Sequence, residues 1–308
     1  MSSDRERASL RENGVTQGWQ QLHLIPMAYY CEISVLQMFP PGHFYSPVPS
    51  IPEVKGRERE IFDVWKKEIP GVNLNVEGQL SLLHKLSQYY PELPFEAHKQ
   101  QNLRYYFENP NFSYADSIVL YCMIRHTRPK RVIEVGSGFS SCVVLDTKEL
   151  FLGNTTTCAF IEPHPELFMS LTKPSDTTWL IQKQVQDVGV DKFSELSSGD
   201  ILFIDSSHVS KVGSDVNYIF FEILPRIERG VYIHFHDIFY PFEYPREWVY
   251  EGRAWNEAYV LRAFLQYNNM FEIVLFNSYL AIFHRNELFT KMPLCEKNPG
   301  GSIWIRKI

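Results

Sequence analysis

The chain has 308 residues and a mass of 36.1 kDa, enough for one α/β domain with a sizeable extension. Hydrophobic residues make up 44% of it and charged residues 21%, which excludes collagen-like and largely disordered proteins. The formal net charge of -6 removes the general attraction to phosphate backbones, so we expect no nucleic-acid partner.

The sequence also argues against a membrane protein and against an oxidising compartment. No apolar run reaches the ~20 residues that cross a bilayer, and the charged start MSSDRERASLRENGV is unlike a signal peptide. We therefore expect a cytoplasmic protein with no membrane partner, for which a homodimer is a compatible state. The five cysteines are scattered without a CxxC pair and are predicted to be buried thiols: Cys31, Cys122, Cys142, Cys158 and Cys295.

A change in composition near residue 110 predicts two parts. Five prolines in Phe39–Pro52 preclude a regular helix and favour an extended, ordered loop. Apolar residues then recur at helical spacing in Glu58–Glu68 and Gly78–Tyr90. We predict that residues 1–112 are a mostly helical N-terminal cap with a proline-rich loop and that residues 113–308 are the ligand-binding core.

The core alternates β-rich runs with helical stretches, which is typical of βαβ units and a parallel sheet. Open sheets of this kind bind ligands beyond the carboxyl ends of their strands, so polar residues there are site candidates. Seven strands are predicted, at Arg131–Val135, Thr157–Glu162, Thr178–Gln182, Asp200–Asp205, Gly230–His236, Phe271–Phe276 and Ser302–Arg306.

The strongest motif is RVIEVGSGFSS, an apolar strand that runs into Gly136 and Gly138 and then into a helix. Glycines at this point let the backbone approach a ligand, and the helix amino terminus offers unpaired N–H groups. Glu134 stands two residues before the first glycine. Glu162 closes the second strand, where a carboxylate can accept both hydroxyls of a ribose. The pattern predicts a nucleoside cofactor.

With these residues the chain resembles the class I S-adenosylmethionine-dependent methyltransferases, whose motif acidic-x-Gly-x-Gly is matched by Glu134, Gly136 and Gly138. The resemblance covers roughly residues 102–308 and extends to small-molecule methyltransferases with segments like IEVGSGFSS, LFIDSSH and HFHD. It implies an α/β fold with a Rossmann-like, seven-stranded, mostly parallel sheet. It also implies S-adenosyl-L-methionine as the cofactor.

The resemblance further implies which residues contact the cofactor. Glu134 and the turn Gly136-Ser137-Gly138 would hold its methionine part. Glu162 would hold the ribose, and Asp187, after the third strand, the adenine edge.

A second group of candidates precedes and begins the first core helix, in the segment QNLRYYFENPNFSYADS. Aromatic faces attract a sulfonium through cation–π interaction, so Tyr106 and Tyr114 are predicted cofactor contacts. Asp116 can bind the ammonium group of the cofactor through its carboxylate.

The third group follows strands four and five, which are neighbours in the methyltransferase sheet order. Asp205, His208, His236 and Asp237 are therefore expected at one edge beside the sulfonium, with Asp205 also in contact with the cofactor. Alternation along the fifth strand puts His234 and His236 on one face. His234 lies deeper and is predicted to be a structural histidine with satisfied hydrogen bonds.

Two ways of activating the methyl acceptor are left open. A histidine with an ordinary pKa of ~6.5 can take the acceptor's proton, which makes His208, His236 and Asp237 catalytic candidates in a metal-free site. A divalent metal would instead lower the pKa of the acceptor hydroxyl, with Asp205, His236 and Asp237 as its ligands. The imidazole in that set favours either a transition metal or no metal at all.

The predicted activity is methyl transfer from S-adenosylmethionine to an oxygen, or to a nitrogen or carbon, of a small metabolite. The aromatic loop Phe239–Trp248 would roof the acceptor pocket, whereas Trp255–Tyr267 is predicted to be a core helix without a functional role. The fold alone leaves three alternatives. These are a cyclase or lyase that releases methylthioadenosine, a non-catalytic nucleoside-binding module, and a nicotinamide oxidoreductase.

Overall fold

The computed structural model describes residues 38–63 and 65–308, so Cys31 and the first part of the predicted cap lie outside the described residues. The chain divides into two compact units after Ser50. Within residues 38–50 the proline-rich segment is a compact turn, not the extended loop that we predicted. Gly42, with φ of 81°, reverses the chain, and its N–H donates to the carbonyl of Val48 at 3.0 Å.

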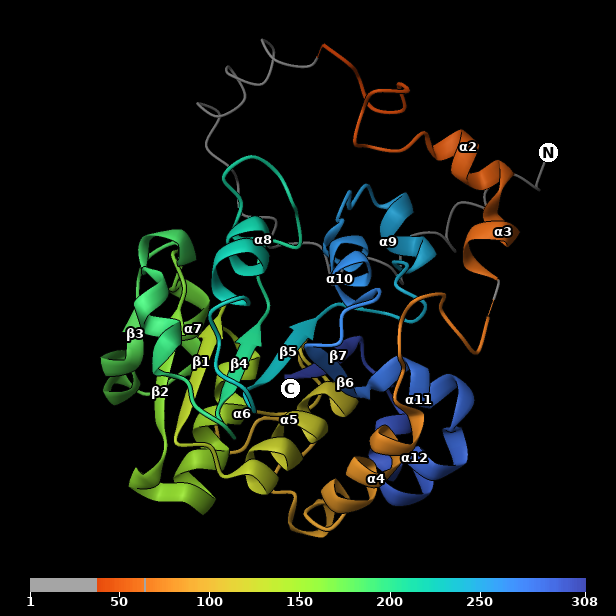
Figure 1. Ribbon diagram of the computed structural model, residues 1–308. Coiled ribbons are helices and arrows are strands. Elements are labelled where there is room, and N and C mark those ends of the chain that lie inside the picture. The colour runs from red at the N-terminus through yellow and green to blue at the C-terminus, as the bar shows by residue number, and fades with distance from the viewer. Residues whose placement is uncertain (1–37, 64) are drawn as a thin grey trace, which may run out of the picture. The chain divides into compact units, whose positions relative to one another are not determined.

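The unit that begins at Ile51 is built on a seven-stranded sheet with the order β3-β2-β1-β4-β5-β7-β6 (Figure 1). Strands β1 to β5 pair in parallel, and β7 runs antiparallel to both β5 and β6. All seven predicted strands are present, and the predicted α/β class is confirmed. The strands are β1 Arg131–Val135, β2 Thr157–Ile161, β3 Leu180–Ile181, β4 Ile201–Ile204, β5 Tyr232–His236, β6 Phe271–Phe276 and β7 Ser302–Lys307.

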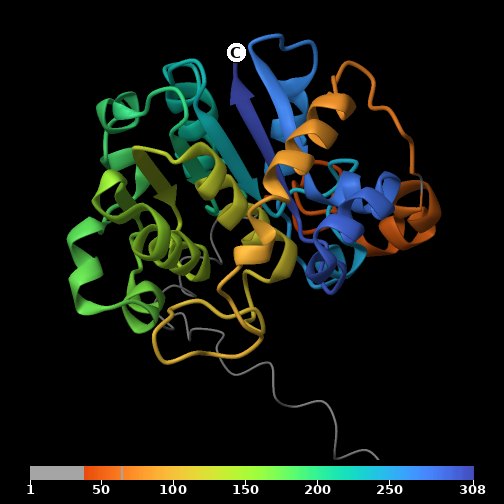
Figure 2. The same ribbon diagram turned by 90° about the horizontal axis from the view of Figure 1, so that it is seen from below.

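Helices pack against the sheet and against one another; Figure 2 shows α4 beside α5 and close to α12, far along the chain. No helix of the described residues is long and apolar enough to span a membrane. The α-helices are α2 Ile51–Gly56, α3 Glu58–Phe62, α4 Val76–Leu86, α5 Tyr114–Thr127, α6 Phe139–Thr147, α7 Glu166–Leu171, α8 Asp215–Tyr218, α9 Arg246–Tyr250, α10 Glu257–Leu265, α11 Asn277–Phe283 and α12 Arg285–Lys291. Shorter 3-10 or π turns are η2 Tyr90–Glu92, η3 Lys148–Leu152, η4 Gly153–Thr155, η5 Pro174–Trp179, η6 Val185–Asp187, η7 Val190–Glu195, η8 Ile219–Ile223 and η9 Pro293–Glu296.

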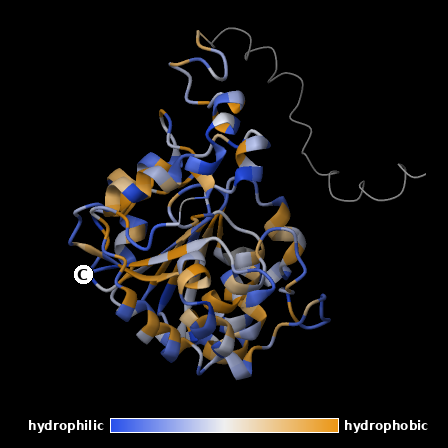
Figure 3. Cartoon of the chain, turned by 90° about the vertical axis from the view of Figure 1, so that its right-hand side faces the viewer, coloured by the Kyte–Doolittle hydropathy of each residue, from blue (hydrophilic) through white to orange (hydrophobic). Residues whose placement is uncertain are grey.

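The apolar strands form the centre of this unit, as their colour in Figure 3 shows. Alternation along β5 separates its side chains as predicted. The ring of Phe235 stacks on Phe220 of η8 at 5.3 Å, whereas His234 and His236 share the opposite face with ring centroids 5.8 Å apart. Full burial of a large apolar side chain contributes roughly 1.5–3 kcal/mol, so these rows of aromatic rings hold the strands in place.

The third strand is shorter than the predicted Thr178–Gln182, because residues 174–179 form η5 instead. The carboxylate of Asp176 accepts the backbone N–H of Lys173 at 2.7 Å, which closes this turn and removes the residues from the sheet. The predicted helix Glu58–Glu68 ends early, at Phe62, where the backbone N–H of Asp63 caps the last turn. The predicted helix Gly78–Tyr90 is α4, shifted toward the amino terminus.

The predicted boundary between cap and core, after residue 112, is not where the chain divides, because residues 51–112 share a compact unit with the sheet. Phe95, Tyr105 and Phe112 are buried in the same apolar core as the strands. The side chain of Gln79 joins α4 to β6, since its carbonyl oxygen accepts the N–H of Phe276 at 2.8 Å. Four cysteines are buried free thiols, as predicted: Cys122, Cys142, Cys158 and Cys295.

Candidate active site

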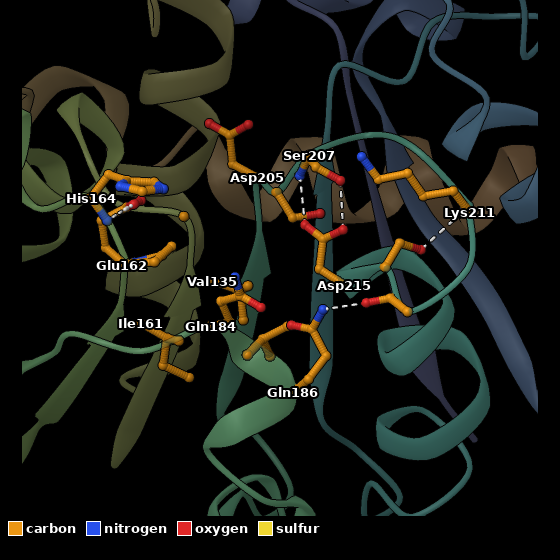
Figure 4. Close-up of a pocket in the computed structure, with 16 residues that line it drawn as sticks. Val135, Ile161, Glu162, His164, Gln184, Gln186, Asp205, Ser207, Lys211 and Asp215 are labelled. Atoms are coloured by element: carbon orange, nitrogen blue, oxygen red, sulfur yellow. Dashed lines mark hydrogen bonds between the residues drawn. The ribbon is translucent and has the colours of Figure 1, made fainter. Parts of the chain in front are cut away.

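A cavity of about 540 Å³ opens at the carboxyl ends of β1, β2 and β4 (Figure 4). The strand order reverses between β1 and β4, and open α/β sheets bind their ligands at such a point. Side chains on its walls include Glu162, His164, Gln184, Gln186, Asp205, Ser207, Lys211 and Asp215. Of these, only Glu162 and Asp205 were predicted from the sequence.

Gly136 forms the turn after β1. Its φ of 82° lies in the left-handed region, and a Cβ at this position would stand 1.7 Å from the carbonyl oxygen of Asp205. Only glycine fits so close an approach. The N–H of Gly136 donates to Ile161 at 2.9 Å, and the N–H of Asp205 donates to Val135 at 2.9 Å. The glycine therefore joins the ends of β1, β2 and β4. Gly138 has open space instead, because its added Cβ would meet only Leu167, at 3.4 Å.

Glu134 lies beneath this turn, fully buried, and does not line the cavity. Its Oε1 accepts the hydroxyls of Ser140 at 2.6 Å and Ser141 at 2.9 Å, which ties β1 to the start of α6. Burial raises the pKa of Glu134 to about 8, although the two serine hydrogen bonds lower it. Its Oε2 has no hydrogen-bond partner within the described chain. Its contact with the methionine part stays a prediction.

Glu162 presents its carboxylate to the cavity at the end of β2. The backbone N–H of Ser137 donates to its Oε2 at 3.1 Å, and the N–H of His164 donates to its Oε1 at 2.8 Å. Two neutral donors thus orient the carboxylate without neutralising its charge.

Asp187 is exposed and does not line the cavity. Gln186, its neighbour in η6, lies on the wall and donates from Nε2 to the carbonyl of Gly213 at 2.8 Å. The structure therefore brings Gln186, not Asp187, to the cavity. A glutamine in a polar loop gave no sequence signal for this position.

Tyr106 is half-buried, and its ring meets Phe139, the first residue of α6, edge to face at 5.7 Å. Tyr114 lies elsewhere, because its ring stacks on Phe107 at 4.8 Å and its hydroxyl donates to Glu108. The structure thus places Tyr106, but not Tyr114, beside the glycine turn.

Asp116 is buried and holds the start of α5 against β7. It accepts the amide of Asn277 at 2.9 Å, the N–H of Gly301 at 3.1 Å and the hydroxyl of Ser302 at 2.6 Å. These three donors satisfy the carboxylate within the fold. Its predicted contact with an ammonium group has no support in this arrangement.

Three side chains meet beyond β4 and β5: potential ligand atoms of Asp205, His208 and Asp237 all lie within 4.8 Å of one another. His208 Nε2 is 3.3 Å from Asp205 Oδ1 and 3.6 Å from Asp237 Oδ2. His208 and Asp237 adopt φ angles of 59° and 55°, in the left-handed region. That conformation costs a non-glycine residue roughly 1–2 kcal/mol and is concentrated at functional sites.

The metal set that we considered contained His236 in place of His208, whereas the side chains that come together among the described residues are those of Asp205, His208 and Asp237. Strand alternation places His236 on the face of the sheet opposite to that of Phe235, where the centroid of its ring lies 5.1 Å from that of Phe112. Its Nε2 stays 3.5 Å from Asp237 Oδ1, so it adjoins the cluster without joining it. Burial lowers the pKa of His236, but the charges of Asp237 and Asp205 outweigh it and raise the pKa overall.

The fourth member of the cluster, Glu257, was not predicted. Its Oε2 lies 2.9 Å from Nδ1 of His208, and both side chains are buried. A signal was present in the sequence: Glu257 shares the buried face of α10 with Ala258, Leu261 and Leu265, where a charged residue is out of place.

The carboxylates around His208 favour a positive charge at the centre of the cluster. Burial alone would lower the pKa of His208, but its contacts with Asp205 and Glu257 raise it well above the ordinary value. Burial raises the pKa of Asp205, yet the charges of His236 and His208 bring it below the ordinary value. Burial raises the pKa values of Asp237 and Glu257.

His234 is a structural histidine, as predicted, but its hydrogen bonds are not satisfied. Its ring lies 4.0 Å from that of Phe203 and 4.8 Å from that of Trp304. Neither ring nitrogen has a partner in the described part of the chain. Burial lowers the pKa of His234 well below its usual value, so this side chain is neutral.

Residues 133–238 match a family model described as a methyltransferase domain. The match runs from β1 past the end of β5 and includes Glu134, Gly136, Asp205 and Asp237. This part of the chain is therefore a methyltransferase domain, as the resemblance to the class I S-adenosylmethionine-dependent methyltransferases implies. It is accordingly an enzyme with S-adenosylmethionine as its cofactor, and the seven-stranded sheet is the one that this family implies.

Other proteins are also similar to this methyltransferase. An uncharacterized protein of Archaeoglobus fulgidus is 37% identical over 177 residues, which are 54% of this chain and 76% of that protein. The methyltransferase PaMTH1 of Podospora anserina, solved with S-adenosylhomocysteine bound, is 12% identical with a TM-score of 0.41, over 85% of this chain and 99% of that one. A protein of Corynebacterium glutamicum is 13% identical with a TM-score of 0.33, over 92% and 97%.

Proposed function

We propose that this methyltransferase transfers the methyl group to an oxygen of a small-molecule metabolite and that Asp205, His208 and Asp237 hold a divalent cation that activates the acceptor. One observation carries the proposal. Ligand atoms of the three side chains lie within 4.8 Å of one another, and Asp205 also lines the cavity that contains Gly136 and Glu162. A nitrogen or carbon acceptor is the less favoured form of the same proposal.

The cofactor contacts that we propose follow from the cavity walls. Glu162 has both carboxylate oxygens held by backbone N–H groups at the end of β2, where they suit the two hydroxyls of a ribose. Ile161, Val185 and Gln186 line the same cavity and would contact the adenine. The turn at Gly136 would bring the methionine part toward Asp205.

The electrostatics of His208 support a cation between the carboxylates. An ionised carboxylate only accepts hydrogen bonds, so Nδ1 carries the hydrogen in the pair with Glu257. The pKa of His208 is raised well above its ordinary value, so Nε2 also carries a hydrogen and faces Asp205 and Asp237 as part of a cation; a bound metal would take the place of that proton.

The donor set fits a divalent metal. Two carboxylates and one imidazole suit a first-row transition metal better than calcium, which prefers oxygen throughout. A bound metal would lower the pKa of the acceptor hydroxyl. The side chains of Asp205, His208 and Asp237 would hold it and keep the acceptor oxygen near the sulfonium.

A metal-free base is the second candidate, and the short contact between His208 and Glu257 supports it. A carboxylate behind an imidazole orients the ring and stabilises the charge that it gains when it takes a proton. In this form the neutral ring of His208, which is present only above its raised pKa, would remove the acceptor's proton through Nε2, and Asp205 and Asp237 would stabilise the imidazolium. Sensitivity to a chelator separates the two candidates.

An aromatic row beside the cluster supports a small acceptor. The ring of Trp255 lies 4.4 Å from that of His208, Trp248 lies 5.5 Å from Trp255, and Phe239 lies 5.2 Å from Trp248. Such a wall would exclude water from the reacting atoms and pack against an apolar part of the acceptor. The predicted role of the loop Phe239–Trp248 as a pocket wall is part of this proposal.

The test is mass spectrometry of products from S-adenosylmethionine and a panel of hydroxylated metabolites, with EDTA and then with added Mn²⁺. We expect S-adenosylhomocysteine together with a methylated acceptor, loss of turnover with EDTA, and recovery with Mn²⁺. We also expect no turnover by D237N and wild-type turnover by the matched control D187N, whose carboxylate is exposed outside the cavity.

Other outcomes would redirect the proposal. Methylthioadenosine formed without an acceptor would favour a cyclase or lyase. Turnover that resists EDTA would favour His208 as a metal-free base. Full activity of D237N would remove the cluster from the reaction. Cytoplasmic location, the absence of a nucleic-acid partner and a homodimer stay predictions.

A further inference from the structure

We infer that Glu257 is a positioning residue that fixes His208 in the orientation and tautomer with which it meets the cation. The inference rests on the proposed function of the cluster and deepens it. Nothing in the sequence motifs or the matched segment 133–238 assigns a role to this residue, because Glu257 lies beyond that segment.

The contact is short, buried and directional. Oε2 of Glu257 lies 2.9 Å from Nδ1 of His208, and the exposed fractions of the two residues are 0% and 4%. Oε1 has no hydrogen-bond partner among the described residues. His208 is thus the side chain that compensates this buried carboxylate. Packing of α10 does not require a charge here, because an apolar residue would suit the face shared with Leu261 and Leu265.

The backbone around the pair is held as firmly as the side chains. The carbonyl of His208 accepts the N–H groups of Asn256 at 3.0 Å and of Glu257 at 3.1 Å. The N–H of Ser210 donates to the side chain of Asn256 at 2.6 Å, and Nδ2 of Asn256 donates to the carbonyl of Ser210 at 3.2 Å. The strained residue His208 is therefore attached to the start of α10 through both backbone and side chain.

This arrangement determines which ring nitrogen faces the site. Because Nδ1 pairs with Glu257, Nε2 is the nitrogen that faces the site, and it lies 3.3 Å from Asp205 and 3.6 Å from Asp237. A carboxylate behind a ligating histidine also raises the basicity of the ring, and its removal typically lowers metal affinity by 10–100-fold. Glu257 would act in this way through His208, without contact with substrate or cofactor.

The experiment measures binding of Mn²⁺ and of S-adenosylhomocysteine by calorimetry, using full-length wild type, E257A, E257Q, D237N and the control E228A. Glu228 is exposed. We expect E257A to weaken Mn²⁺ binding about 10–100-fold with unchanged binding of S-adenosylhomocysteine. E257Q should recover part of the loss, because its amide oxygen still accepts the hydrogen of Nδ1. If Glu257 only stabilised the fold, the variants would not follow this order of Mn²⁺ affinities.

Each result decides one claim. If wild type binds Mn²⁺ and D237N does not, while E257A and E257Q bind as wild type does, the role of Glu257 is overturned and the cation site stands. If wild type fails to bind Mn²⁺, or D237N binds it equally well, the cation site fails and the inference fails with it. If E257A does not fold, E257Q decides: it supports the inference by weakened Mn²⁺ binding and overturns it by wild-type binding.

Discussion

Two clusters in this methyltransferase each gather three carboxylates around one buried basic side chain. In the first, Arg104 binds Asp146 at 2.7 Å, Glu149 at 2.9 Å and Asp176 through two hydrogen bonds at 2.8 and 3.1 Å. The second oxygen of Asp146 accepts the N–H groups of Arg104 and Tyr105 at 2.8 and 2.9 Å. Every charge in this cluster has a partner at hydrogen-bond distance.

The second cluster surrounds His208 and is incomplete by comparison. Glu257 makes a short contact of 2.9 Å with Nδ1 of His208, whereas Asp205 and Asp237 stand farther away, 3.3 and 3.6 Å from Nε2. Asp205 keeps a third of its side-chain surface exposed, next to the cavity. The comparison teaches that the number of carboxylates does not reveal their role. The completed cluster stabilises the fold, and the incomplete one leaves its carboxylates available to another cation.

The largest effect is expected at Arg104. R104A would leave the buried carboxylates of Asp146 and Asp176 without their cation, which costs about 3–5 kcal/mol of unfolding free energy. Urea denaturation measures the loss. The control R226A removes an arginine from an exposed pair with Glu222 and should change stability by less than about 1 kcal/mol. A stable R104A protein would show that the two clusters do not differ as proposed.

The opposite pattern is expected at Asp237. D237N should lower methyl transfer by about 100-fold or more, because the acceptor's proton is no longer handled, while unfolding free energy stays within about 1 kcal/mol of wild type. Turnover assays and urea denaturation on the same preparation measure both quantities. A loss of stability as large as that of R104A would make the His208 cluster structural.

The glycine turn connects the cofactor cavity to Asp205, and a pair of variants tests this link. G136A places a methyl group on the carbonyl of Asp205 and should cost about 1–3 kcal/mol of stability, with weaker binding of S-adenosylhomocysteine. G56A is the control, since a Cβ at Gly56 has room and this residue lies outside the cavity. Calorimetry and urea denaturation should rank G136A below G56A in both stability and binding; equal behaviour would contradict the link.

The last prediction concerns the pH dependence of stability at Glu134, whose hydrogen-bond partners are neutral hydroxyls. Its pKa is raised from 4.5 to about 8, so between these values the folded protein keeps a proton that the unfolded chain has lost. The contribution of Glu134 to the unfolding free energy is therefore largest below about pH 4.5. It declines as pH rises to about 8, by at most about 1.4 kcal/mol per pH unit. E134Q, a neutral analogue of the protonated acid, should flatten the decline in urea denaturation between pH 5 and 8. An unchanged slope would show that Glu134 is ionised in the folded protein.

The sequence was sufficient for features that depend on local pattern. Apolar runs such as ILFI and FEIVLF predicted β4 and β6, and the spacing of Glu134, Gly136 and Gly138 predicted the turn after β1. The carboxyl ends of neighbouring strands placed Asp205 and Asp237 together, as the structure shows.

Features that depend on long-range contacts escaped prediction. Arg104 meets Asp176 across 72 residues, and Glu257 meets His208 across 49. Such pairings form only when the chain folds, and no motif spacing encodes them. The exchange of His236 for His208 in the cluster has a similar cause, because strand alternation governs His236, whereas the strained backbone beyond β4 turns His208 toward Asp237.

The most direct measurement is an anomalous difference map from crystals grown with S-adenosylhomocysteine and Mn²⁺, for the wild type and for D237N. The proposed function predicts one peak bounded by the carboxylates of Asp205 and Asp237 and by Nε2 of His208, and its loss in D237N. A map with the cofactor product bound but no peak among these three side chains at saturating Mn²⁺ would contradict it.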